Sequence, residues 1–142
     1  MLNPFSLPLH PAINHFPLAM LSVAWACVLI RYATGNVTWD GRVRLFEVVG
    51  VASLPFTVVA AFIDTRGIDF LLDPRVDAPL IWHMTSGLLA AIVFGLHYFW
   101  RRTKEPAELT GRNAIQDIAL ITFGMIALLG AGLLGAEVVY GG

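Results

Sequence analysis

Four histidines are the residues of this chain best suited to chemistry, and all of them lie near the ends of apolar segments. His10 and His15 stand at the threshold of the first apolar run, and His83 lies at the start of the third. His97 lies toward the other end of that third run. Histidine is the commonest metal ligand and titrates near neutrality, and ionisable side chains at a membrane boundary are functional candidates. These positions therefore suit heme binding, a small metal site or proton handling.

The composition indicates which solvent surrounds these histidines. Of the 142 residues, 57% are hydrophobic and only 13% are charged, whereas a soluble domain carries about 25% charged residues. The shortage of charge indicates a protein embedded in lipid, and the length predicts a single domain spanning residues 1–142. A net charge of −1 gives no basic face for nucleic acid. The only cysteine, Cys27, allows no internal disulfide.

Four apolar runs define the predicted architecture, an all-α bundle of four transmembrane helices. They cover about residues 13–30, 45–63, 80–100 and 118–139, and each is close to the ~20 residues that cross a bilayer as a helix. Pro17 leaves the start of the first helix open. The helix begins at Pro11 and bends at Pro17, or it begins at Pro17 itself, because proline is favoured at the first helical position.

The basic residues predict the orientation of the bundle. The first and third links carry seven of them, and the second link carries two, Arg66 and Arg75. Positively charged links stay in the cytoplasm, so both termini and the second link are expected to be periplasmic or extracellular. The seven are Arg31, Arg42, Arg44, Arg101, Arg102, Lys104 and Arg112.

This orientation gathers three histidines at the outer face of the bundle. His10, His15 and His83 lie there, from two helices far apart in sequence. A ligating histidine usually donates its second ring nitrogen to a carboxylate or carbonyl. The groups expected to support the histidines at that depth are Asp64, Glu137 and Tyr140.

Helical spacing selects among the histidines. His10 and His15 are five residues apart, which rotates them by about 140° relative to one another on a regular helix. They cannot both face one bundle interior unless the helix starts between them, as the Pro17 alternative allows. His15, beside Pro17, is the preferred candidate. We therefore predict one b-type heme or related redox metal with His15 and His83 as axial ligands, and His10 as the substitute for His15. His97 shares a helical face with His83 but has no histidine partner, so it is interpreted as an interfacial residue.

The small residues of the fourth segment can be interpreted in two ways. Gly124, Gly130, Gly132 and Gly135 lie among alanines. Small side chains let helices approach closely in lipid, or they leave room for a flat cofactor.

Several of these motifs together resemble a known bacterial family. Leu9-His10-Pro11 with His15-Phe16-Pro17 forms an HPxxxHFP pattern, Trp82-His83 opens the third helix, and Gly132 to Gly135 with Val138 to Gly141 close the fourth. Over essentially the whole chain this is similar to the four-helix membrane family named domain of unknown function 2231. The resemblance implies a multi-pass protein of the cytoplasmic membrane, and relatives fused or adjacent to redox proteins suggest heme or electron transfer. Where relatives often carry a further histidine after the tyrosine, this chain has Gly141, which weakens a three-histidine site.

Three functional hypotheses follow. The leading one is electron transfer through a heme near the outer face, to or from a redox protein or a quinone. The second is a non-catalytic membrane subunit or scaffold that docks a partner, and a homo-oligomer is plausible for so small a bundle. The third, a proton-coupled transporter, is less favoured because midplane positions such as Val59, Ala90 and Met125 are apolar. In each case an accessory or electron-transfer subunit is expected rather than a stand-alone enzyme.

Overall fold

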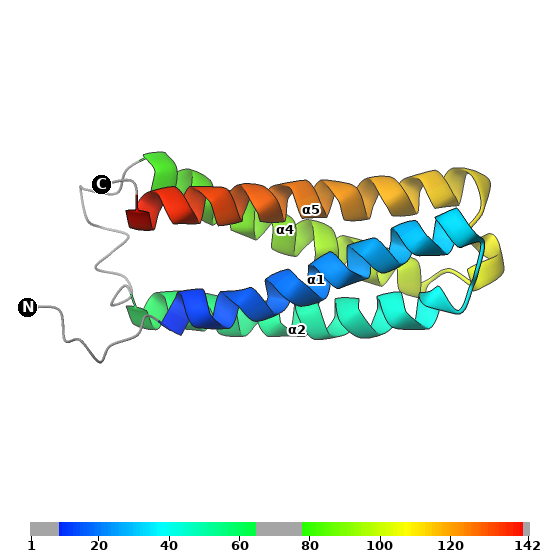
Figure 1. Ribbon diagram of the computed structural model, residues 1–142, viewed down its shortest axis with the longest axis horizontal. Helices are drawn as coiled ribbons and strands as arrows, with labels where there is room; N and C mark the ends of the chain where they lie inside the picture. Colours follow the sequence, from blue (N-terminus) through cyan, green and yellow to red (C-terminus); the bar gives the residue numbers. More distant parts are fainter. Residues whose placement is uncertain (1–8, 65–77, 141–142) are drawn as a thin grey trace, which may run out of the picture.

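The computed structural model describes residues 9–64 and 78–140, apart from the side chains of residues 9–11, 64, 79 and 136–140. Its main elements are four long helices, and no strand occurs among the described residues. They are α1 (Leu9–Thr34), α2 (Trp39–Asp64), α4 (Ala78–Arg102) and α5 (Gly111–Tyr140), with the short 3₁₀ helix η1 (Pro106–Glu108) between the last two (Figure 1). The all-helical fold predicted from the four apolar runs is confirmed.

The four helices form two hairpins, α1–α2 and α4–α5, that lie side by side (Figure 1). Across the hairpins, α1 packs on α5 and α2 packs on α4, so α1 and α4 lie diagonally in the bundle. We call the end that holds residues 35–38 and 103–110 the link end. The opposite end, where α1 begins and α5 ends, is the terminus end.

Local signals explain the turn between α1 and α2. Gly35 has φ of 67°, a left-handed conformation that glycine adopts readily and that commonly ends a helix. The side-chain oxygen of Asn36 then accepts a hydrogen bond of 3.0 Å from the backbone N–H of Thr38. This contact, of the kind that asparagine makes in turns, leads directly into α2.

Proline 17 lies inside α1 rather than at its start. The helix already begins at Leu9 and continues through Pro17 to Thr34, so the alternative in which Pro17 opens the helix is wrong. Pro17 is also fully buried. His15 is two residues away, which turns it about 200° around the helix, and it is exposed.

Two glycines set the close approach of helices within the hairpins. A Cβ on Gly50 of α2 would lie 2.6 Å from the buried side chain of Leu21 on α1. A Cβ on Gly124 of α5 would lie 3.1 Å from Phe94 on α4. The expectation of close packing thus holds at Gly124, whereas a Cβ at Gly130 or Gly132 would meet nothing within 4 Å.

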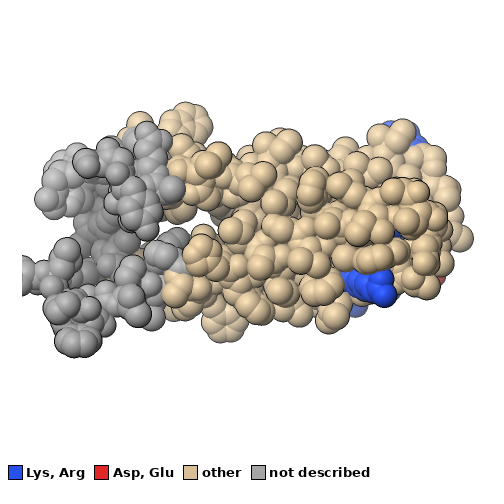
Figure 2. Space-filling view, viewed as in Figure 1, with Lys and Arg blue, Asp and Glu red and all other residues tan. Residues whose placement is uncertain are grey.

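The surface of the described helices is largely apolar. Four spans are long and apolar enough to cross a membrane: Ala12–Thr34, Trp39–Ile63, Leu80–Arg102 and Gly111–Gly135. Large side chains such as Leu133 and Phe56 are exposed along them. In the face drawn in Figure 2, the lysines and arginines of the described residues gather at the link end. Apolar surface of this extent fits a lipid environment, and the chain is a multi-pass membrane protein.

Replacing Gly50 by alanine should destabilise the bundle. The new methyl group collides with Leu21, and overpacking of a filled core costs about 1–3 kcal/mol. We expect a lower thermal unfolding midpoint for Gly50→Ala, measured by circular dichroism in a mild detergent. The matched control is Gly95→Ala on α4, whose Cβ would meet nothing within 4 Å. Equal midpoints for the two variants would contradict the close approach of α1 and α2.

Candidate functional site

Six ionisable side chains are buried together near the link end, and we call them the charge cluster. They belong to the same buried helical stripes that form the apolar core. On α2, for example, Asp40 and Glu47 are seven residues apart, which is within about 20° of two full turns. His97 and Arg101 are likewise one turn apart on α4. The members are Arg31, Asp40, Glu47, His97, Arg101 and Asp117, and none is more than 6% exposed.

His97 lies at the centre of the charge cluster, between two carboxylates. Its Nε2 atom is 2.7 Å from Oδ1 of Asp117 on α5, and its Nδ1 atom contacts Oε1 of Glu47 on α2. An ionised carboxylate can only accept hydrogen bonds, and a neutral imidazole has only one N–H. Both contacts can be satisfied when His97 is a doubly protonated imidazolium or when one carboxyl group carries a proton. Either arrangement places one more proton among these three side chains than a neutral imidazole and two ionised carboxylates carry.

Two arginines complete the charge cluster. Arg101 donates from one guanidinium to both Asp117 and Asp40. Arg31 on α1 lies on the other side of Asp40, with Nε 3.3 Å from Oδ1 of that carboxylate. Arg31 also donates to two carbonyl oxygens of the α4–α5 link, those of Leu109 at 2.9 Å and Pro106 at 3.0 Å. All four helices thus meet in one ionic network.

The charges of the cluster balance only when it holds one extra proton. Three carboxylates contribute −3 and two arginines contribute +2, so a neutral His97 leaves a net charge of −1. An unbalanced buried charge is costly in a low-dielectric interior. One proton, on His97 or on a neighbouring carboxylate, brings the total to zero. This count agrees with the hydrogen-bond geometry of the imidazole.

The network runs from the link end of the bundle into its interior. Nearest the link end, the partly buried Tyr32 donates from its hydroxyl to Oδ2 of Asp117 at 2.7 Å. Deepest in the bundle, Oε2 of Glu47 is buried and has no hydrogen-bond partner among the described residues. Glu47 is eight residues along α2 from Trp39, which is about 12 Å into the helix. The hydrogen-bonded path runs from Tyr32 through Asp117 and His97 to Glu47.

Apolar packing closes the bundle beyond Glu47, toward the terminus end. Leu21, Ala24 and Phe94 are completely buried there, in one continuous cluster with Ile121 and Leu128. Two polar pairs join α1 to α5 at its edge: Trp25 donates to Thr122 at 3.1 Å, and the hydroxyl of Ser22 lies 3.7 Å from the sulfur of Met125. The hydrogen-bonded path thus reaches the partly buried Tyr32 near the link end, whereas apolar side chains pack beyond Glu47.

A family model matches this architecture over nearly the full chain. The model, described as a predicted membrane protein (DUF2231), covers residues 6–142. The chain belongs to the DUF2231 family. No curated protein and no solved structure matches it. The resemblance seen in the sequence is confirmed, and the function of this DUF2231 protein has to be argued from its own residues.

The histidines predicted as heme ligands lie at the terminus end of the DUF2231 bundle. We expected His15 to face into the bundle. In the structure its side chain is exposed on α1, on the side away from buried Pro17. His83 on α4 is half-buried against α5, with Nδ1 2.7 Å from the carbonyl oxygen of Ala131. A Cβ on Gly135 would lie 2.9 Å from this ring. The side chains of His10, Asp64, Glu137 and Tyr140 lie outside the described residues.

The sequence interpretation of His97 as an interfacial residue is wrong, because its side chain is completely buried. The missed signal was Glu47, an ionisable residue inside the second predicted membrane segment. Arg101 was counted only among the basic residues of the links, and Asp117 directly precedes the fourth predicted segment. The midplane positions noted before are apolar as expected, with Ala90 and Met125 buried in the core. The ionisable groups lie between that depth and the link end.

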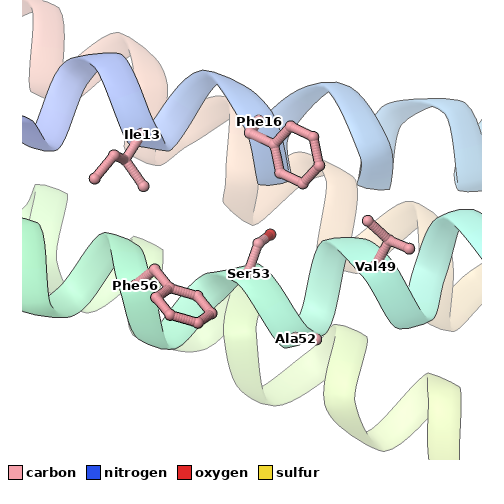
Figure 3. A pocket seen from close by; sticks show the side chains of 6 residues that line it. All are labelled: Ile13, Phe16, Val49, Ala52, Ser53 and Phe56. Carbon is pink, nitrogen blue, oxygen red and sulfur yellow. The ribbon is translucent and has the colours of Figure 1, made fainter.

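The grooves and side-chain groups elsewhere offer less chemistry. A shallow groove of about 490 Å³ between α1 and α2 is lined by Ile13, Phe16, Val49, Ala52, Ser53 and Phe56 (Figure 3). Its one hydroxyl, on Ser53, donates to the carbonyl oxygen of Gly50 at 2.7 Å. Among the described residues, no group of three histidine, cysteine or acidic side chains has a geometry that could hold a metal ion. The charge cluster is thus the strongest candidate site.

Removing the Asp117 carboxylate should destabilise the protein strongly. Asp117→Asn leaves Arg101 and His97 without a shared counter-charge, and breaking a buried ion pair costs about 3–5 kcal/mol. We expect a large fall in the thermal unfolding midpoint in detergent. Glu105→Gln, on the exposed α4–α5 link, is the matched neutralisation and should cost less than about 1 kcal/mol. Similar losses for both variants would show that the cluster does not hold the bundle together.

Proposed function

We propose that this membrane protein takes up and releases one proton at the buried His97 centre, from the side of the membrane that the link end faces. In this role it serves as a proton-responsive subunit or module of a membrane process rather than as a stand-alone enzyme. The observation that carries the proposal is the placement of both His97 ring nitrogens against carboxylates. One proton balances the charge of the whole cluster, so protonation and packing are linked.

The direction of proton exchange is supported by the path through the cluster. Tyr32 is partly accessible near the link end and is hydrogen-bonded to Asp117, which contacts His97. His97 in turn contacts Glu47, and packed apolar residues lie beyond it. A proton that enters at the link end can be stored between His97 and Glu47, and it leaves by the same route. The proposal is therefore proton binding from one side, not conduction across the bilayer.

Linkage between pH and stability should depend on His97. Its proton is bound in the folded cluster, so raising the pH until this proton leaves should restore the net charge of −1 and loosen the bundle. We expect the thermal unfolding midpoint of the wild type to fall as the pH rises through the range in which this proton leaves. His97→Gln, which cannot carry the charge, should have a lower midpoint at neutral pH and lose that dependence.

A direct readout is the nitrogen NMR spectrum of histidine-labelled protein in lipid. Both ring nitrogens of His97 should be protonated at neutral pH, and Glu47→Gln should change their shifts. His15→Gln, which removes an exposed imidazole, should leave the His97 signals unchanged. A singly protonated His97 ring, unaffected by Glu47→Gln, would refute the shared proton on the ring. Proton flux through liposomes holding the wild type, above that of empty liposomes, would refute one-sided exchange.

A second candidate function is the heme or redox-metal site at the terminus end, favoured by the setting of His83. A hydrogen bond from Nδ1 to a backbone carbonyl, as His83 makes to Ala131, is the orientation that metal-ligating histidines commonly have. Gly135 leaves the space that this ring occupies. Heme would supply one-electron transfer to a redox protein or quinone. His15, His10 and His83 remain its predicted ligands.

Optical spectroscopy tests this second candidate. Protein expressed with ample heme should show a Soret band that shifts on reduction with dithionite, and His83→Ala should remove it. His97→Gln is the matched control and should keep the Soret band, since His97 lies in the charge cluster and not at the terminus end. Absence of the band in the wild type would rule out heme binding.

A further inference from the structure

A second polar feature lies on the outside of the bundle at the link end, in a groove between α2 and α4. The groove has a volume of about 410 Å³ and is lined by Gly41, Arg44, Leu45, Val48, Tyr98 and Arg102. It is separate from the charge cluster, whose members are buried inside the bundle. Its lining combines two cations with apolar side chains.

The two arginines of the groove differ from those in the charge cluster. Arg44 and Arg102 are both exposed, and neither takes part in an ion pair found among the described residues. Arg102 lies over the ring of Tyr98, 5.5 Å from its centroid, and donates to its hydroxyl at 3.0 Å. The contact of Arg44 is at the limit for a hydrogen bond, 3.5 Å to the carbonyl oxygen of Lys104. The groove therefore presents positive charge without an anion from the described chain.

The depth of the groove matches a lipid headgroup region. Arg102 is the last residue of α4, and Gly41 lies in the first turn of α2, so both belong to the helix ends. Leu45 and Val48 continue from Arg44 toward the middle of α2, and they are 57% and 38% exposed. Polar anchors at the helix ends and apolar side chains deeper along the same surface match the two parts of a phospholipid.

We propose that this groove binds an anionic phospholipid of the surrounding membrane. Its phosphate lies between Arg44 and Arg102, with an acyl chain along Leu45 and Val48. Guanidinium groups suit phosphate because they offer several N–H donors in a planar fork. Basic pockets between transmembrane helices are a general means of holding anionic headgroups. The space above Gly41 is open, since a Cβ there would meet nothing within 4 Å.

The apolar half of the groove favours a lipid over a soluble phosphate compound. A free anion gains nothing from Leu45 and Val48, whereas an acyl chain covers both. The charge distribution also agrees, because the basic links are predicted to face the cytoplasmic leaflet, where anionic lipids concentrate. The occupant is thus a component of the bilayer that already surrounds the groove.

Native mass spectrometry of the purified full chain can test this site. The probes are phosphatidylglycerol, the zwitterionic phosphatidylcholine, and glycerol phosphate as the soluble headgroup. We expect one retained phosphatidylglycerol per chain, with at least about tenfold weaker retention of phosphatidylcholine. The Arg44→Gln/Arg102→Gln double variant should lower phosphatidylglycerol retention by about tenfold or more, because both guanidinium groups that attract the anionic headgroup are lost.

Two further variants separate the groove from general surface charge. Arg112→Gln removes an exposed arginine that does not line the groove, and it should retain the lipid as the wild type does. Gly41→Leu keeps both arginines but fills the groove, and it should lose the lipid. Equal losses for Arg112→Gln and the double variant, retention by Gly41→Leu, or glycerol phosphate binding as tightly as the lipid would each overturn the proposal.

Discussion

The contact of His97 with Glu47 and Asp117 is the interaction on which the rest of the structure depends. In lipid, helices gain little from burying apolar surface against one another, so the joining of two hairpins needs a more specific attraction. Glu47 comes from the first hairpin, and His97 and Asp117 come from the second. Arg31 and Tyr32 add contacts from α1 to the same region. The hairpins are thereby fastened through ionic contacts concentrated at one end.

This arrangement divides the bundle into two regions with different physics. Near the link end, buried charges require exact pairing, and a change of one proton alters the balance of the whole network. Toward the terminus end, small and branched apolar side chains fill the interior, and the glycines at 50 and 124 allow close backbone approach within each hairpin. Charge pairing therefore governs the contacts near the link end, and side-chain shape governs those toward the terminus end.

The apolar runs were enough to predict the four helices, because crossing a bilayer requires about twenty apolar residues. The helix ends were less predictable. Polar residues such as Asp40 and Asp117 look like boundaries, yet both lie inside helices and are buried. The predicted site drew on histidines that share an end of the bundle. His97 was missed because its partners are 50 and 20 residues away in the sequence. Which side chains pair across helices depends on how each helix is rotated about its own axis, and the sequence does not show this.

The split of the charge cluster between hairpins has a consequence for biogenesis. The cluster members of the α1–α2 hairpin, Arg31, Asp40 and Glu47, sum to −1, and with His97 in the proposed protonated state those of the α4–α5 hairpin sum to +1. A hairpin on its own would hold an unneutralised charge, which docking against the other hairpin balances. Opposite signs make each half the other's best available partner. Halves translated as separate polypeptides are therefore expected to associate in the membrane.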